Sequence, residues 1–511
     1  VAECAGEPGP CESAAVPQPK GGHRAGTGRL GADAYVGAER TACRHEELAV
    51  GQRCPVCGRG QLYGLPAGVE IRIKGQALLA AIRYEREKLR CSACGMVCTA
   101  ALPPEAGAEK YSPHARAVVG VSREYLGLPL SRLEAYQAML GGPVPDATPW
   151  EQLERVADGG SGVFAHLERL AAQGELLQQD DTSVRMLAFL KAHQTAPPER
   201  TGMDTTVLLV KVGEQMLCLS YSGRAHAGEN LRTLLTQRQA GPALPLVMSD
   251  ALASKAADET LLIRCHCLAH GRRTFRDLEE VFPQECQVVV AALTQVCDHE
   301  EEARDAQMSP TERLAYHQAS SRPLMDGLKR WLDQQLAERL VEPNSSLGKA
   351  MASLQTHGET LTRFRTIAGA PLENNVAERA LKLLIRQRKN SLFSATEHSA
   401  SIASLLTSLI ATCLQAGGNA VEYLVALQEH RHQVCAAPGA WLPWTSQATL
   451  APPEATRRPS RAICARAGSP FPRRMLSSRA DRGTRASAVV GHQVNRPCDK
   501  RFRQSQYPCP S

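Results

Sequence analysis

Apolar positions follow two different spacings along this chain, and the spacing changes near residue 178. Before that point, apolar residues three and four apart predict helices at 115–126, 130–140 and 150–177. After it, short and partly β-branched runs predict strands at 184–189, 205–212, 216–221, 244–249 and 261–267. A predicted helix at 229–239 separates the third strand from the fourth. Strands mixed with helices in this order indicate an α/β protein with a mixed sheet.

Helical spacing returns after the predicted sheet. Residues 276–360 are predicted to be helical, and so are 374–390 and 398–414. Large aliphatic side chains almost vanish after Trp444, so we expect no packed structure beyond it. These patterns predict seven segments, which are a mostly disordered start (1–48), a cysteine-containing domain (49–102), a helical region (103–175), the first part of the sheet domain (176–275), a helical insertion (276–360), the second part of the sheet domain (361–447) and a basic disordered tail (448–511).

The net charge of +7 belongs to the tail rather than to the predicted sheet. Residues 451–511 hold 13 Lys and Arg against 3 Asp and Glu, which leaves the preceding 450 residues slightly acidic. The total charge therefore says little about what the folded part binds. The longest nearly apolar stretch, 402–414, falls short of the roughly 20 residues that cross a bilayer. We expect a soluble protein with no membrane partner.

Four cysteines have the spacing of a metal site. The pairs are Cys54-Pro-Val-Cys57-Gly and Cys91-Ser-Ala-Cys94-Gly. Two such knuckles can offer four thiolates to one tetrahedral Zn²⁺, and a closed site of this kind is structural. The intervening chain is long enough for a hairpin and a short helix at 76–89. The alternatives are four unrelated thiols, or a site in which Cys98 replaces one ligand.

Three acids on separate predicted elements form a second candidate site. Asp180 precedes the first predicted strand, Asp250 ends the strand at 244–249, and Glu378 lies on the helix at 374–390. Carboxylates placed in this way can converge on two Mg²⁺ ions, which prefer hard oxygen ligands. Two such ions can activate an attacking oxygen and stabilise a leaving oxygen. Three acids alone are a weak signal, because the chain contains 52 Asp and Glu.

The surroundings of these acids strengthen the signal. Glu378 shares one helix face with Lys382, Arg386 and Lys389, and Arg388 is adjacent in sequence. Cations beside a metal-binding carboxylate suit the phosphates of a nucleic acid, although a solvated amphipathic face has the same pattern. In the segment 264–275, Cys267 and His270 alone are too few to hold a metal. We expect this segment to direct His270, Arg272 and Arg273 towards phosphates, with a structural role for His270 as the alternative.

Several of these motifs, taken in order, resemble transposases of the insertion sequence 66 family. The resemblance extends from about residue 25 to 447. It is specific because the motifs occur together, at 28–35, in the two cysteine pairs, and at 179–182, 248–254, 267–273, 374–382 and 386–393.

The resemblance implies a ribonuclease-H-like core with a DDE triad and a helical insertion before the glutamate. Carried over by motif, Asp180, Asp250 and Glu378 are the catalytic ligands of Mg²⁺ or Mn²⁺. Family members cut the ends of a DNA element and join the freed 3′-hydroxyl to target DNA. The implied partners are DNA, further copies of the same chain and accessory proteins of the element. The implied location is the bacterial cytoplasm, in association with the nucleoid.

The chain departs from the family pattern at several positions. Asp181 stands where Glu is more common and competes with Asp180 for the first ligand position. Glu373 replaces the Asp that usually precedes Asn374 and Asn375. The segment beyond 447 matches nothing in the family, which leaves open a truncated or frame-altered copy. The alternative functions are a zinc-dependent DNA-binding remnant without catalysis and a related metal-dependent nuclease.

Overall fold

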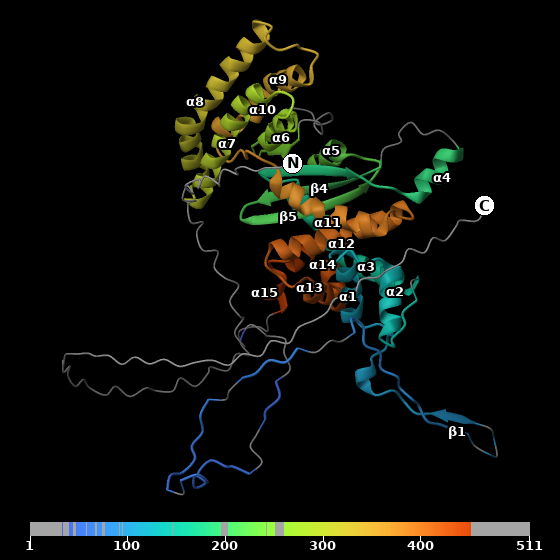
Figure 1. The fold of residues 1–511 in the computed structure, drawn as a ribbon. Helices are drawn as coiled ribbons and strands as arrows, with labels where there is room; N and C mark the ends of the chain where they lie inside the picture. Colours follow the sequence, from blue (N-terminus) through green and yellow to red (C-terminus); the bar gives the residue numbers. More distant parts are fainter. Residues whose placement is uncertain are drawn as a thin grey trace, which may run out of the picture. The chain divides into compact units, whose positions relative to one another are not determined.

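A mixed sheet of five strands forms the centre of the described chain (Figure 1). The computed structural model describes residues 33, 40–43 and 47–450, except 58, 67–68, 74–76, 91, 93, 95, 146, 196–202, 242 and 251–259. The strands are β3 (Leu176–Ser183), β4 (Asp204–Val212), β5 (Gln215–Gly223), β6 (Leu246–Ser249) and β7 (Ile263–His266). Their order in the sheet is β5-β4-β3-β6-β7. The β3, β4 and β5 strands form an antiparallel meander, whereas β6 and β7 run parallel to β3.

Alternate residues of β4 show how helices cover the two faces of the sheet. Val207 and Leu209 are buried against α11 (Asn375–Ser391). Leu208 and Val210 point the other way and belong to a larger apolar cluster, which includes residues of α3 (Ala147–Ala171) and α5 (Ala227–Leu235). A strand buried on both faces is apolar at successive positions, which is why β4 reads as a continuous apolar run.

Helix α12 (Glu397–Gln415) covers the edge of the sheet at β5, which would otherwise be exposed. The Thr412 hydroxyl accepts a hydrogen bond from the Cys218 backbone N–H at 3.0 Å and donates one to its carbonyl at 3.1 Å. The Ser408 hydroxyl accepts from the Ser220 N–H at 2.8 Å. Buried backbone groups need such partners, and an uncovered edge strand would offer them to another chain.

The helices between β7 and α11 form a separate apolar cluster, which confirms the predicted helical character of 276–360. Its large buried side chains include Phe275, Leu293 and Phe364. Figure 1 shows this group of helices beyond the sheet, on the side away from α12 and α13. The elements are α6 (Leu268–Leu278), α7 (Pro283–Asp305), α8 (Pro310–Ala337), α9 (Ser346–Thr356), α10 (Gly358–Leu361) and the 3₁₀ turn η3 (Arg363–Arg365).

The remaining elements lie before the sheet, in the connection between β3 and β4, and at the end of the described chain. They are β1 (Lys88–Arg90), β2 (Val97–Thr99), η2 (Pro104–Ala106), α1 (Pro113–Glu124), α2 (Leu130–Met139), α4 (Leu187–Thr195), α13 (Ala420–Glu429), α14 (Arg431–Ala436), η4 (Pro438–Trp441) and α15 (Ser446–Leu450). Searching the described helices for one that combines the length and the apolar character of a membrane span finds none. The predictions of disorder for 1–48 and 448–511 fall almost entirely outside the described residues.

Three predicted elements were wrong. The first strand is Leu176–Ser183, and α4 begins within the run 184–189 that was predicted as a strand. The helix predicted at 150–177 ends at Ala171, because the chain turns there and enters β3. No helix forms in the described part of 76–89, which is irregular until β1 begins at Lys88. In the first two cases, the pairing of Leu176–Ser183 with β4 and β6 outweighed the local pattern.

Candidate metal and DNA-processing site

The register of two parallel strands brings Asp180 and Asp250 to the same end of these strands. β3 pairs with β6 so that Gln178 lies opposite Met248. Two residues further along both strands, the same register brings Asp180 level with Asp250, which directly follows β6. Asp180 therefore lies within β3 rather than before the first strand, and the two acids meet at one end of the paired strands.

Asp180 and Asp181 face opposite sides of the sheet. Asp180 pairs with Val207, which packs against α11, so its side chain lies on the α11 face. Asp181 points to the other face, where its carboxylate accepts a hydrogen bond from the N–H of Ala227 at 3.2 Å. Ala227 is the first residue of α5, so Asp181 caps a helix N-terminus. The two adjacent acids therefore differ in position: Asp180 lies on the α11 face, whereas Asp181 caps α5 on the other face.

Glu378 reaches the α11 face from the first turn of α11. The chain before this helix is bound to β3 by two hydrogen bonds. The Asn374 side-chain amide donates to the Gln179 carbonyl at 2.8 Å, and the Gln178 amide donates to the Glu373 carbonyl at 3.3 Å. The residues of β3 that form these bonds, Gln178 and Gln179, directly precede Asp180. The start of α11 is thus fixed relative to that aspartate, with Asn375 half-buried as the first helical residue.

The charges of Asp250 and Glu378 both influence the pKa of Asp180. Burial raises the pKa of Asp180 to about 6, and the negative charges of Asp250, Glu378 and Asp181 act in the same direction. The hydrogen bond that its carboxylate accepts from the Asp181 N–H at 2.9 Å opposes the rise. Carboxylates that repel one another in a half-buried position favour a bound cation or a bound proton.

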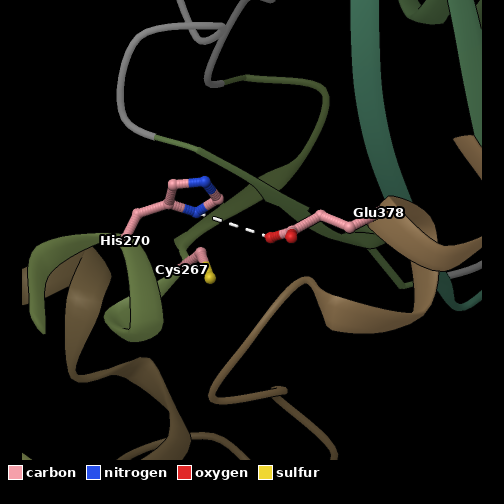
Figure 2. Close-up of side chains that lie close together, drawn as sticks. All are labelled: Cys267, His270 and Glu378. Atoms are coloured by element: carbon pink, nitrogen blue, oxygen red, sulfur yellow. Dashed lines mark ion pairs between the residues drawn. The ribbon is translucent and has the colours of Figure 1, made fainter. Parts of the chain in front are cut away.

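Cys267 and His270 lie next to these acids. Cys267 immediately precedes α6, and His270 is in its first turn. Figure 2 shows the His270 ring directed at the Glu378 carboxylate, with Nδ1 and Oε1 separated by 3.7 Å. The Cys267 sulfur raises the pKa of His270 to about 9, and the charges of Glu378 and Asp250 add to this effect while burial opposes it. Of the residues predicted to face phosphates, His270 therefore contacts the acids.

Arg272 and Arg273 lie further along α6. Arg272 is half-buried and close enough to Cys297 of α7 to lower the pKa of that thiol, which burial raises. Arg273 is exposed to solvent. The structure thus places one arginine towards the insertion and one at the surface.

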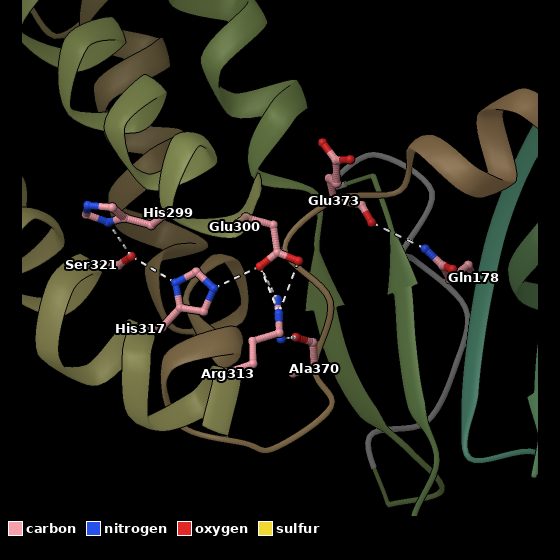
Figure 3. Close-up of polar contacts among 8 residues, drawn as sticks. All are labelled: Gln178, His299, Glu300, Arg313, His317, Ser321, Ala370 and Glu373. Carbon is pink, nitrogen blue, oxygen red and sulfur yellow. Dashed lines mark hydrogen bonds and ion pairs between the residues drawn. The ribbon is translucent and has the colours of Figure 1, made fainter. Parts of the chain in front are cut away.

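A buried polar network supports the segment that leads into α11 (Figure 3). Arg313 of α8 forms two hydrogen bonds to Glu300 of α7, at 2.8 and 3.1 Å, and donates a third to the Ala370 carbonyl at 2.8 Å. The ring of His317, fully buried, contacts the same Glu300 carboxylate at 2.8 Å. The pKa of Glu300 is lowered although burial alone would raise it, because His317 and Arg313 donate to its charged form. The sequence signal for this network was the spacing of Arg313 and His317, four residues apart on one helix face.

The cations predicted to contact DNA divide into two groups. Lys382, Arg386 and Lys389 are exposed on one side of α11, as their spacing predicts, and Arg386 also donates a hydrogen bond to the Tyr125 carbonyl at 3.1 Å. Arg388 instead points back to β3, where it donates to the Thr182 hydroxyl at 2.6 Å and to the Ser183 carbonyl. Arg388 therefore contacts the end of the strand that carries Asp180.

Three of the four predicted zinc ligands, Cys54, Cys57 and Cys94, lie within the described residues. Cys91 lies outside the described residues, so the four-cysteine set stays a prediction. Cys54 and Cys57 sit in one tight turn, where backbone N–H groups of Gly60 and Arg59 and the Cys54 side chain lower the pKa of the Cys57 thiol. Cys57, Cys94 and Cys98 are exposed. A lowered thiol pKa favours the thiolate form that binds metal.

Comparisons with known proteins identify relatives of this chain. It is similar to three uncharacterised proteins of Sinorhizobium fredii. Protein y4hP is 23% identical over 70% of this chain and 67% of its own length. Proteins y4qI and y4jD are 27% and 30% identical, over 35% and 32% of this chain, and the alignments cover only about a third of each relative. The family model for the IS66 family of transposases matches residues 109–402, more than half of the chain. This chain therefore belongs to the IS66 transposase family.

Proposed function

We propose that this chain is a DDE transposase that cuts and joins DNA during transposition of an insertion sequence. In this proposal, Asp180, Asp250 and Glu378 are the catalytic acids. The observation that supports it is the position of Asp250, directly after the strand that pairs in parallel with the strand of Asp180, together with the effect of the Asp250 and Glu378 charges on the pKa of Asp180. Three antiparallel strands followed by two parallel ones, in the order β5-β4-β3-β6-β7, support a ribonuclease-H-like core.

The acids fit a pair of divalent ions. Their oxygens are the hard ligands that Mg²⁺ or Mn²⁺ prefers, and the mutual repulsion that raises the pKa of Asp180 is what bound cations would relieve. Bound ions would activate the attacking oxygen and stabilise the leaving oxygen during phosphodiester cleavage. The protein itself supplies the fixed positions. Strand pairing sets the two aspartates, and the bonds from Asn374 and Glu373 to β3 set the start of the glutamate helix.

The exposed face of α11 is suited to hold the DNA backbone near these acids. Lys382, Arg386 and Lys389 extend along the helix that begins beside Glu378. Neutralising phosphates with Lys and Arg gives affinity without reading sequence. We expect Lys382→Ala and Lys389→Ala each to weaken DNA binding and to lower the slope of log affinity against log salt by about one. The control is Lys329→Ala on α8, an exposed lysine of the insertion that should leave the slope unchanged.

The cysteine pairs form the second part of the proposal. Cys54, Cys57, Cys91 and Cys94 would hold one structural Zn²⁺ that folds the segment 49–102. The two knuckles and the thiolate-favouring turn at Cys57 support it. Recognition of element ends, assembly of several copies on DNA and accessory proteins of the element belong to the same proposal.

The decisive test uses substitutions that keep side-chain shape. Asp180→Asn, Asp250→Asn and Glu378→Gln should each reduce Mg²⁺-dependent cleavage of element-end DNA to the level without protein, while DNA binding persists. Asp181→Asn is the matched control, because its side-chain oxygen can still accept from the Ala227 N–H on the far face of the sheet. Activity that survives in all three variants would overturn the proposed site.

Two further outcomes separate the alternative functions. Cleavage without strand-transfer products, even from pre-cut ends, would identify a nuclease. DNA binding with no cleavage by the unmodified chain would identify a non-catalytic remnant. Either result would overturn the proposed reaction while leaving the family assignment intact.

A further inference from the structure

Three side chains of different chemistry converge beside the proposed catalytic acids. Cys267, His270 and Glu378 each offer one ligand atom, and these atoms all lie within 4.8 Å of one another. Figure 2 shows the sulfur, the imidazole and the carboxylate directed at a common space between the start of α6 and the start of α11. The sequence motif contains two of these groups, Cys267 and His270. Folding brings the third, Glu378, from α11, the helix that follows the insertion.

The contact between His270 and Glu378 has the length of a ligand pair rather than that of a hydrogen bond. Nδ1 and Oε1 are 3.7 Å apart, beyond the usual limit of a hydrogen bond. Nδ1 is itself buried and has no hydrogen-bond partner. Ligands at about 2.0–2.3 Å from a tetrahedral zinc ion lie about 3.3–3.7 Å from each other. The observed separation fits two ligands of one such ion.

The sulfur is held in a fixed position. Cys267 is almost fully buried and occupies the N-cap position of α6. The backbone N–H of Asn374 donates to its sulfur at 3.2 Å. Asn374 also binds β3, so one residue links the thiol, the strand of Asp180 and the helix of Glu378.

We propose that Cys267, His270 and Glu378 form a zinc site next to the acid triad. The donor set of sulfur, nitrogen and oxygen suits Zn²⁺, whereas Mg²⁺ does not take a thiolate. Three protein ligands leave a fourth position, which the partial exposure of His270 and Glu378 opens to solvent. Glu378 would then use one oxygen for this ion and the other for the ions of the triad. The site is distinct from the one proposed at Cys54, Cys57, Cys91 and Cys94.

Zinc content of the purified full-length protein tests this inference directly. We expect Cys267→Ser to contain one equivalent of zinc less than the unmodified chain after equilibration with Zn²⁺ and removal of the excess. Glu378→Gln and His270→Ala should lower zinc affinity at this site by at least about 10-fold to 100-fold, since even supporting residues around a metal have effects of that size. Cys297→Ser, which alters a half-buried cysteine of α7 outside the cluster, is the control and should keep the full content.

A spectroscopic probe separates this ion from the other metals. In a Cys54→Ser/Cys91→Ser background, added Co²⁺ should give a thiolate-to-cobalt charge-transfer band that disappears with Cys267→Ser. Each variant's circular dichroism and thermal transition are compared with the parent, so that a loss of folding is not read as a loss of a ligand. Unchanged zinc content in a folded Cys267→Ser variant, or no cobalt–thiolate band in the double-variant background, would overturn the site.

The inferred zinc site shares Glu378 with the proposed triad but can be tested separately from the proposed catalysis. Asp180→Asn should lose Mg²⁺-dependent cleavage and yet keep both the zinc content and the cobalt–thiolate band. A protein that binds zinc at Cys267 but never cuts DNA would contradict the proposed function only.

Discussion

The two parts of this chain that carry metal-ligand chemistry differ in how their ligands are supported. At the sheet, Leu177 of β3 is 0% exposed, and the strand continues directly into Asp180. In the cysteine region, Val56 between Cys54 and Cys57 is 94% exposed, and Leu89 of β1 is 61% exposed. One group of ligands is thus anchored in an apolar core, whereas the other lies on a chain with little buried surface.

This difference indicates where the folding free energy of each site comes from. Strand pairing and apolar burial position the acids before any ion binds, so a metal there adds chemistry to an existing geometry. In our proposal the cysteine segment, which has little buried surface, gains its stability from its Zn²⁺, as small zinc domains do. Substitutions in the two regions should therefore differ in how much stability they remove.

A leucine-to-alanine pair compares the two regions directly. Leu177→Ala should reduce the free energy of unfolding by about 2–5 kcal/mol, because it removes a fully buried side chain and leaves a cavity. Leu89→Ala in β1 should change it by less than about 0.5 kcal/mol. Urea unfolding followed by fluorescence measures both. A comparable loss in the two variants would mean that the cysteine region has a core of its own.

The next largest loss of stability is expected at the edge of the sheet that α12 covers. Thr412→Val should cost about 1–3 kcal/mol, since it leaves the buried N–H and C=O of Cys218 without their partner. Ser401→Ala, which removes an exposed hydroxyl from the same helix, is the control. The measurement is again urea unfolding. Equal stability of Thr412→Val and the parent would show that α12 does not stabilise β5 through these bonds.

The acid site has a pH signature when divalent ions are removed. The pKa of Asp180 rises from 3.8 to about 6 on folding, so between these values the folded chain holds a proton that the unfolded chain has released. Stability in EDTA should therefore fall as pH rises from about 4 to about 6, by on the order of 1 kcal/mol because the group is partly solvated. Asp180→Asn should remove this fall. Thermal melts across this pH range that keep the same slope in the variant would show that another group causes the fall.

The smallest change in global stability is expected in the cysteine region. Cys54→Ser should speed proteolysis within 49–102 while changing the unfolding free energy of the sheet by less than about 0.5 kcal/mol. Cys43→Ser alters an exposed cysteine outside the proposed set and should leave both unchanged. Limited proteolysis and a thermal melt of the same samples provide the two readouts. A large stability loss in Cys54→Ser would show that the two regions fold as one.

The spacing of apolar residues predicted those elements whose side chains alternate between buried and exposed positions or form a continuous buried run. β4 is apolar because it packs inside the sheet, β5 is apolar because α12 covers it, and α11 and α12 have the spacing of half-buried helices. β3 escaped notice because its residues Gln178, Gln179, Asp180 and Asp181 are polar. Their burial is offset by specific partners, such as the Glu373 carbonyl and the Ala227 N–H, which no local pattern contains.

The residues of the candidate site could be predicted from the sequence, but the contacts between them could not. The motifs named Asp180, Asp250 and Glu378, yet only the strand register shows that Asp181 faces the other way. Cys267 and His270 were known as a pair. Their approach to Glu378 depends on how α6 and α11 pack, which is a property of the whole fold.

The position of α11 after the insertion has a consequence for protein synthesis. Asp180, Asp250, Cys267 and His270 leave the ribosome well before Glu378, and α12, which covers the edge of β5, follows later still. A nascent chain therefore carries two acids without the third until the insertion is complete. If the triad cuts DNA, a message that ends within the insertion would yield a polypeptide unable to cut, and cutting would be confined to chains whose translation has passed α11.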